Sequence, residues 1–250
     1  MGERDKETGI RSLPGQGAAI ETMSRVANLK PTTILDCQHP QVRQLAHDLR
    51  GRRTDDRAFL TIAHTYLVHA VRPIYSMNDL QPASKTLQKQ RGSCSQRIAC
   101  LEALARAAGI PTKVRALRID GSLWYPRFGY ARTLVPRELW LAWPQFFLEG
   151  RWVDFDEIYA PIVPQAGQAH ELFTNRGESI FDAVAHTAVD FFGKTKSQES
   201  GRSACDLSSF VLADEGIFDT RDEVFLRAGS FHRTLRGRAF ELIFGGRKSA

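Results

Sequence analysis

Cys94 and the residues around it have the types and spacing needed for nucleophilic chemistry. Ser93 and Gln96 have the spacing of a capping box, which makes Ser93 the N-cap of a predicted helix and Cys94 its first residue. The unpaired amides and positive dipole end of a helix start favour thiolate over thiol, and they can also receive an oxyanion. Gly92 lacks a side chain, so the backbone there can approach a substrate closely. Cys94 is therefore a candidate nucleophile, although a cysteine without such context is more often a small buried apolar residue.

The elements that must position Cys94 are predicted from apolar periodicity and stop signals. The helix that begins near Cys94 is expected over residues 95–108, because Gly109 and Pro111 follow it. Two amphipathic helices are expected before it, over 40–50 and 55–71, and strands after it over 113–119, 140–148 and 151–155. Glu149 and Gly150 join the last two strands as a hairpin turn. This order predicts an α+β fold in which helices pack on an antiparallel sheet.

A long motif around Cys94 resembles one protein family. The run LQKQRGSCSQRIACLEALARAAGIPTKVRAL, Leu87 to Leu117, resembles the heart of the transglutaminase-like family, a branch of the papain-fold cysteine enzymes. In that family a Gly-x-Cys helix start leads to a helix that ends in an Arg-Ala-x-Gly-Ile-Pro turn. The matching residues are Gly92, Cys94, Arg106, Ala107, Gly109, Ile110 and Pro111. The segment FFLEGRWVDFD, Phe146 to Asp156, resembles the family's hairpin, so the resemblance covers residues 36–159 and implies a papain-like fold.

The resemblance implies a Cys-His-Asp triad, in which the histidine moves a proton and the aspartate orients the histidine. Asp156, four residues after Trp152, matches the family's aspartate. The family's histidine stands two residues before an aromatic residue at the start of the first hairpin strand. That position falls on Leu141, ahead of Trp143, and leucine cannot transfer a proton.

Three hypotheses account for the missing base. In the first hypothesis the protein has lost its acyl chemistry and binds a partner or ligand. In the second, a histidine from elsewhere in the chain, His186 or His232, reaches Cys94. In the third hypothesis Cys94 receives an already activated acyl group with help from a weaker base, such as Glu138.

Other residues near the motif are expected to contact substrate or to support the fold. Gly92, Ser93, Leu141 and Trp143 are the expected substrate contacts, although the hairpin tryptophans also favour packing in the core. His39 and His64 match the family's scaffold and are expected to be structural.

Composition limits the class of protein. An apolar content of 42% and a charged content of 25% in 250 residues are ordinary for a globular protein. Residues 1–27 are expected to be a flexible arm, and 28–250 a single domain with a core at 36–159 and an extension at 160–250. A surface loop is expected at 194–203. The sequence has no signal-peptide pattern and no long apolar run, and its four cysteines lack disulfide-scaffold or zinc spacing. A cytoplasmic location without cofactor, metal or membrane association is expected.

The net charge of +6 calls for an explanation of its own. Arginines are spread along the chain without interleaved aromatic residues, so nucleic-acid binding ranks last. The expected partners are a small-molecule or peptide acyl substrate and, by analogy with the family, an acidic carrier protein. The expected function is cysteine-dependent acyl chemistry, which cleaves an amide or forms one through a Cys94 thioester. The alternative is a catalytically silent binding module.

Overall fold

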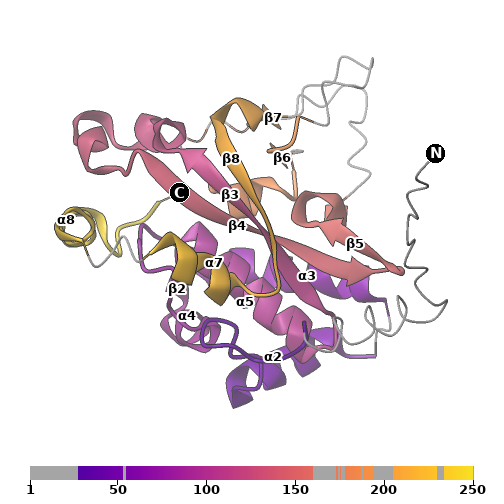
Figure 1. Ribbon diagram of the computed structural model, residues 1–250. Helices are drawn as coiled ribbons and strands as arrows, with labels where there is room; N and C mark the ends of the chain where they lie inside the picture. Colours follow the sequence, from indigo (N-terminus) through magenta and orange to yellow (C-terminus); the bar gives the residue numbers. More distant parts are fainter. Residues whose placement is uncertain are drawn as a thin grey trace, which may run out of the picture.

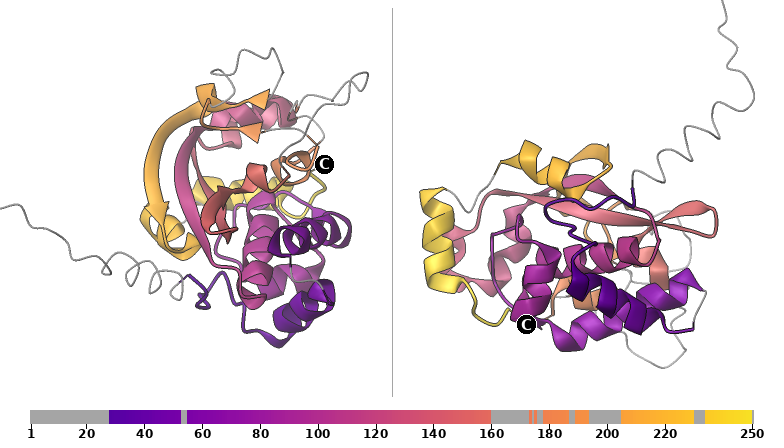
Figure 2. Two further views of the ribbon diagram at one scale, coloured as in Figure 1. Left: turned by 90° about the vertical axis from the view of Figure 1, so that its right-hand side faces the viewer. Right: turned by 90° about the horizontal axis from the view of Figure 1, so that it is seen from below.

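A curled antiparallel sheet with helices packed on one face makes up the core of the molecule (Figures 1 and 2). The computed structural model describes residues 28–52, 55–159, 173, 175, 178–186, 189–193, 205–229 and 234–249 of the chain. The arm expected at 1–27 and the loop expected at 194–203 lie outside these residues. The α+β fold predicted from the sequence is confirmed.

The sheet has the strand order β5-β4-β3-β8. Strand β3 (Thr112–Asp120) pairs along its whole length with β4 (Glu138–Leu148), and β4 pairs with β5 (Arg151–Asp154). Glu149 and Gly150 form the predicted hairpin turn, with φ values of 52° and 81° that suit a type I′ turn. Strand β8 (Val211–Phe218) pairs with the other edge of β3 and comes from the part of the sequence without a strand prediction.

Helix α5 (Cys94–Ala107) lies at the centre of the helical layer, against α2 (Pro40–Arg50), α3 (Asp56–Ala70) and α4 (Ala83–Lys89). These elements confirm the three predicted helices and add α4. Residues 96–106 of α5 are all buried, so the helix is covered on every side rather than on one apolar face. Its buried charges, Arg97, Glu102 and Arg106, therefore each need a partner.

Short elements complete the fold around this core. Strands β1 (Arg72–Pro73) and β2 (Arg91–Gly92) form a parallel pair just before Cys94. A second parallel pair is formed by β6 (Val189–Asp190) and β7 (Cys205–Asp206). The described residues also form helices α6 (Ile180–Ala183), α7 (Arg221–Ala228) and α8 (Leu235–Phe244). Their 3₁₀ turns are η1 (Gly121–Arg127), η2 (Gly129–Leu134), η3 (Phe155–Tyr159) and η5 (Ser208–Phe210).

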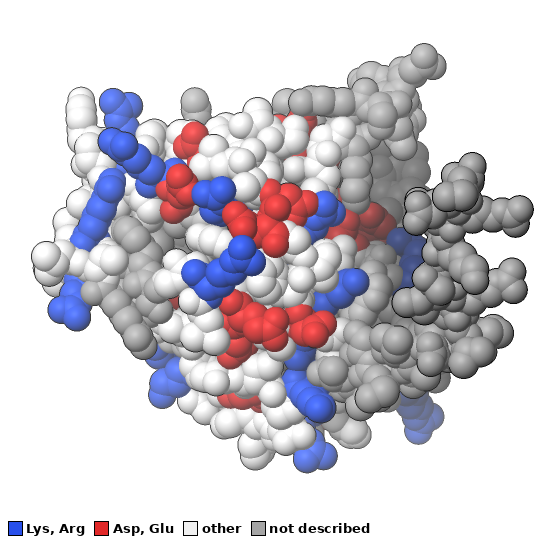
Figure 3. Space-filling view, in the orientation of Figure 1, with Lys and Arg blue, Asp and Glu red and all other residues white. Residues whose placement is uncertain are grey.

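Basic and acidic side chains alternate over the sheet face seen in Figure 3. Arg115 on β3 pairs with Asp214 on β8, and Arg118 pairs with Glu215 at 2.7 Å. The positive net charge therefore does not form one continuous field over this face. Among the described helices, none has the length and apolar composition needed to cross a bilayer.

Candidate functional site

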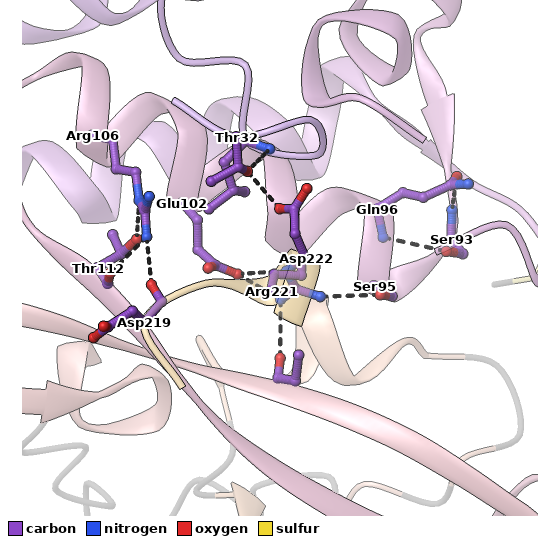
Figure 4. Close-up of polar contacts among 12 residues, drawn as sticks. Thr32, Ser93, Ser95, Gln96, Glu102, Arg106, Thr112, Asp219, Arg221 and Asp222 are labelled. Carbon is purple, nitrogen blue, oxygen red and sulfur yellow. Dashed lines mark hydrogen bonds and ion pairs between the residues drawn. The ribbon is translucent and has the colours of Figure 1, made fainter. Parts of the chain in front are cut away.

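Cys94 is the first residue of α5, as the capping box predicts. The Ser93 hydroxyl accepts a hydrogen bond from the Gln96 amide at 3.3 Å, and the Gln96 side chain accepts one from the Ser93 amide at 3.0 Å (Figure 4). The amides of Cys94 and Ser95 belong to the first helical turn, where the backbone has no intrahelical acceptor. These two amides can stabilise the oxyanion that forms when the Cys94 sulfur adds to a carbonyl group.

Cys94 lines a cavity of about 140 Å³, hereafter the Cys94 cavity. Its polar lining includes Asp79, Ser93, Cys94 and Ser95, which we call the polar wall. Its apolar lining, which we call the apolar wall, includes Trp124, Phe128, Trp140, Leu141, Ile180 and Phe240. Cys94, Ser93 and Leu141 therefore meet in one site, as expected from the sequence.

Asp79 is a site residue that the sequence did not reveal. Its carboxylate accepts a hydrogen bond from the Ser95 hydroxyl, and burial raises its pKa to about 6, against the opposing effects of Ser95 and Arg221. A carboxyl group with this pKa can both accept and donate a proton near neutral pH. Asp79 lines the same cavity as Cys94 because the Ile74 amide donates to the Gly92 carbonyl at 3.1 Å, which brings the loop after β1 beside the start of α5.

A buried arginine holds the Ser95 side chain through a hydrogen bond. Arg221, 1% exposed, donates to the Ser95 hydroxyl at 3.1 Å and to Glu102 at 2.5 and 2.9 Å (Figure 4). It also donates to the Ala142 carbonyl at 3.0 Å, which connects α5 to β4. Because Ser95 accepts from Arg221, its own proton points to Asp79. The network therefore orients the carboxylate on the polar wall.

The Cys94 thiol is protonated at neutral pH, contrary to the sequence expectation. Burial raises its pKa to about 11, although the charge of Arg97 and a hydrogen bond from the Phe181 amide act in the opposite direction. Desolvation of the thiolate thus outweighs the stabilisation expected from the helix start. Any reaction of Cys94 must remove its proton during the attack.

The histidines do not supply this base among the described residues, where none lines the Cys94 cavity. His186 is exposed, and His232 lies outside the described residues. His64 is 1% exposed and its Nε2 lies 2.6 Å from the Phe181 carbonyl, to which it donates. Burial lowers the pKa of His64 to about 4, so it is neutral at physiological pH and structural, as predicted.

Comparison with known proteins gives a family match for the central segment. Residues 43–157 match the model of the transglutaminase-like superfamily. This segment is a transglutaminase-like core. It carries Cys94, Asp79 and Leu141, whereas β8, α7 and α8 lie outside the matched residues. Arg221 and Phe240 are thus additions to the core.

Other comparisons found distant matches or none. A candidate cysteine protease from Cytophaga hutchinsonii has 17% identity and a TM-score of 0.41, and the match covers 52% of this chain and 40% of that one. A candidate protease from Parabacteroides distasonis has 16% identity and a TM-score of 0.33, with 52% and 26% covered. The chain thus spans less than half of either structure. The comparison with curated proteins gave no match.

Asp156 of the transglutaminase-like core bonds to a tryptophan. The Trp143 indole Nε1 donates to Asp156 Oδ1 at 3.3 Å. Trp143 is fully buried, and its ring packs against Phe155 at 5.3 Å and Phe191 at 5.1 Å between centroids. Trp143, an expected substrate contact, does not line the Cys94 cavity, because the sheet pleat directs this side chain into the core.

Gly92 and Glu138 also differ from their expected roles. A Cβ at Gly92 would lie 2.7 Å from Thr86 Cγ2, so packing against α4 requires glycine there, and Gly92 does not line the cavity. Glu138 is exposed and pairs with Arg118 at 3.1 Å, outside the Cys94 cavity. Within the described part of the chain, no cluster of histidine, cysteine and acidic side chains could hold a metal ion.

Proposed function

We propose that this protein catalyses acyl transfer through a thioester on Cys94, using an activated acyl donor. The observation that carries the proposal is that Cys94 and Asp79, a proton acceptor with a pKa of about 6, lie on the same polar wall at the start of α5. The transglutaminase-like core favours cysteine-based acyl chemistry. A thioester donor suits a site with a carboxylate base, because a thiolate leaving group needs less assistance than an amine.

The proposed step balances without a further reactant. The Cys94 sulfur adds to the carbonyl carbon of a donor R–CO–S–R′, and the thiol proton passes to the Asp79 carboxylate. Because the thiol has the higher pKa, the proton leaves as the carbon–sulfur bond forms. The Cys94 and Ser95 amides stabilise the oxyanion. The bond to R′ then breaks, R′–S takes the proton from Asp79, and Cys94–S–CO–R remains. Attack by an amine yields an amide and restores the thiol.

The donor that suits the surface charge is an acyl group on an acidic carrier protein. Arg132 on η2 and Arg236 and Arg238 on α8 are exposed, and Lys and Arg side chains gather along the α8 edge in Figure 3. The inner side of α8 supplies Phe240 to the Cys94 cavity. An acidic partner held at this edge would lie next to the cavity, and its association would be steered by charge.

A binding module without catalysis is the second candidate. Leu141 occupies the position where the resemblance implies a histidine, and the raised pKa of Cys94 keeps the thiol protonated. A ligand could then occupy the cavity without forming a bond to sulfur. Such binding would depend on the apolar wall and would not require a base on the polar wall.

Intact-mass measurement of acyl-enzyme formation separates the two functions. The protein is incubated at pH 7.5 with the benzoyl thioester of N-acetylcysteamine, a small thioester donor. We expect the wild type to gain one benzoyl group at Cys94, Cys94→Ala to gain none, and Cys100→Ala, altered at a buried thiol on the same helix, to behave like the wild type. An unmodified wild type that binds the donor would overturn acyl transfer in favour of the binding module.

A further inference from the structure

Polar side chains near the apolar wall are already bound to other groups of the protein. Arg127 also lines the cavity, but it donates to the carbonyls of Asn175 at 3.1 Å and Ser249 at 2.5 Å, and to that of Glu178. The Asn175 side-chain amide donates to the Leu123 carbonyl, and the Ser179 hydroxyl donates to Asp182 at 2.7 Å. These polar groups are engaged by the protein, so this side of the cavity offers apolar surface to a ligand.

The apolar wall is also rigid. Phe128 packs against Phe240 at 5.3 Å and against Tyr75 at 4.8 Å between ring centroids, in a small cluster separate from the main core. Phe240 is 1% exposed and Leu141 is 9% exposed, so both already contact other side chains. A wall of packed rings keeps its shape when a ligand enters.

The volume of the cavity limits the ligand. An apolar protein cavity of roughly 150 Å³ accommodates benzene, and the Cys94 cavity measures about 140 Å³. A group of about six carbon atoms therefore fits when its carbonyl carbon lies at the polar wall. A long alkyl chain exceeds this volume.

We propose that the Cys94 cavity is an acyl-binding pocket selective for a compact apolar acyl group, such as benzoyl or a short branched chain. The identification of the ligand as an acyl group rests on the proposed function. The selectivity itself is a property of binding and does not require catalysis. In this account Leu141 forms part of the acyl-binding surface instead of supplying a base. The polar wall holds the carbonyl group, and the apolar wall selects the acyl chain.

Binding can be measured without catalysis in the Cys94→Ala variant. Trp124 and Trp140 line the cavity, so their fluorescence reports its occupancy. N-acetylcysteamine thioesters of acetyl, benzoyl and decanoyl groups are titrated into the protein. Because each buried methylene contributes roughly a fourfold gain in affinity, we expect benzoyl to bind at least tenfold more tightly than acetyl. Decanoyl, which exceeds the cavity, is expected to bind more weakly than benzoyl.

Three further variants test which residues line the cavity. Leu141→Phe fills the cavity and is expected to lower benzoyl affinity at least tenfold while leaving acetyl affinity within about threefold. Trp152→Phe alters a tryptophan outside the cavity and should keep the fluorescence change, whereas Trp140→Phe should reduce it. Far-UV circular dichroism confirms that each variant is folded. If Leu141→Phe does not fold, Leu139→Phe, which enlarges a half-buried side chain of the same cavity, replaces it.

Equal affinity for acetyl and benzoyl, or no binding of either, would overturn the acyl-binding pocket. Selective benzoyl binding in Cys94→Ala, together with an unmodified Cys94 in the wild type, would retain the pocket and overturn acyl transfer. The two proposals thus fail in different experiments.

Discussion

The polar and apolar walls of the Cys94 cavity are built in different ways. The polar wall depends on one network, in which Arg221 holds Ser95 and Ser95 holds Asp79. The apolar wall is a set of packed side chains from several elements, supported by contacts such as that between Phe128 and Phe240. The difference indicates that a single substitution can disable the polar wall, whereas the apolar wall changes by degrees.

The largest effect is expected from Arg221→Met, which removes the support of the polar wall. Glu102, 0% exposed, would lose its partner, so the free energy of unfolding should fall by about 3–5 kcal/mol. Urea denaturation measures this change. Arg227→Met removes an arginine whose side chain is 58% exposed and is the matched control, expected to change stability by less than about 1 kcal/mol. Similar losses for both variants would contradict a special role for Arg221.

His64 tests the support of the apolar wall, because it holds the Phe181 carbonyl next to Ile180. Its pKa is lowered to about 4 in the folded protein, from an ordinary value near 6.5. Its contribution to stability is therefore present above pH 6.5 and is lost as the pH falls towards 4. The loss should reach about 3 kcal/mol.

His64→Gln should remove most of this acid dependence, as seen in urea denaturation at pH 7.5 and pH 4.5. His47→Gln, changed at a side chain that is 85% exposed, should keep the dependence of the wild type. Equal acid dependence in the wild type and His64→Gln would show that another group controls it.

Asp79 is expected to change stability with pH in the direction opposite to that of His64. Its folded pKa of about 6 exceeds its ordinary value, so its contribution to stability is present below about pH 4 and is lost as the pH rises through 6. The free energy of unfolding of Asp79→Asn should therefore match that of the wild type at pH 4. At pH 7.5 it should be higher by about 2 kcal/mol, since partial exposure of the carboxylate reduces the full effect of about 3 kcal/mol. Asp48→Asn, on the exposed side of α2, is the control. A destabilised Asp79→Asn at pH 7.5 would show that the charged carboxylate supports the fold.

Leu141→His exchanges the character of the apolar wall at one position. An imidazole beside Cys94 would accept the thiol proton, so alkylation by iodoacetamide at pH 7.5 should accelerate about tenfold or more. Intact mass measures the rate, and Trp152→His, which places the same ring outside the cavity, is the control. An unchanged rate in Leu141→His would show that residue 141 does not face the sulfur.

Local signals explain which elements the sequence predicts. The capping box at Ser93, the turn at Gly150 and the stop at Gly109 each lie within the element that they define. Strand β8 has no such signal: it alternates between half-buried and exposed residues, and Gly216 interrupts it with a φ of 92°. Its position becomes definite only through pairing with β3.

In the site, too, only the residues that belong to local motifs could be predicted from the sequence. Cys94, Ser93 and Leu141 could be placed in one site because their motif is continuous or lies on a recognisable hairpin. Asp79 and Arg221 could not, because their positions depend on β1–β2 pairing and on a contact across 126 residues. The protonated state of Cys94 was also missed, since the helix start is visible in the sequence but the extent of burial is not.

The pH dependence of Cys94 acylation tests the central claim most directly. Single-turnover rates with the benzoyl thioester are measured by intact mass from pH 4.5 to 10 in the wild type and in Asp79→Asn. The account predicts that the wild-type rate rises with an apparent pKa near 6, and that Asp79→Asn lacks this rise and is slower by about 100-fold at pH 7.5. Rates that coincide in the two proteins, and that increase only as the pH approaches the thiol pKa of about 11, would contradict it.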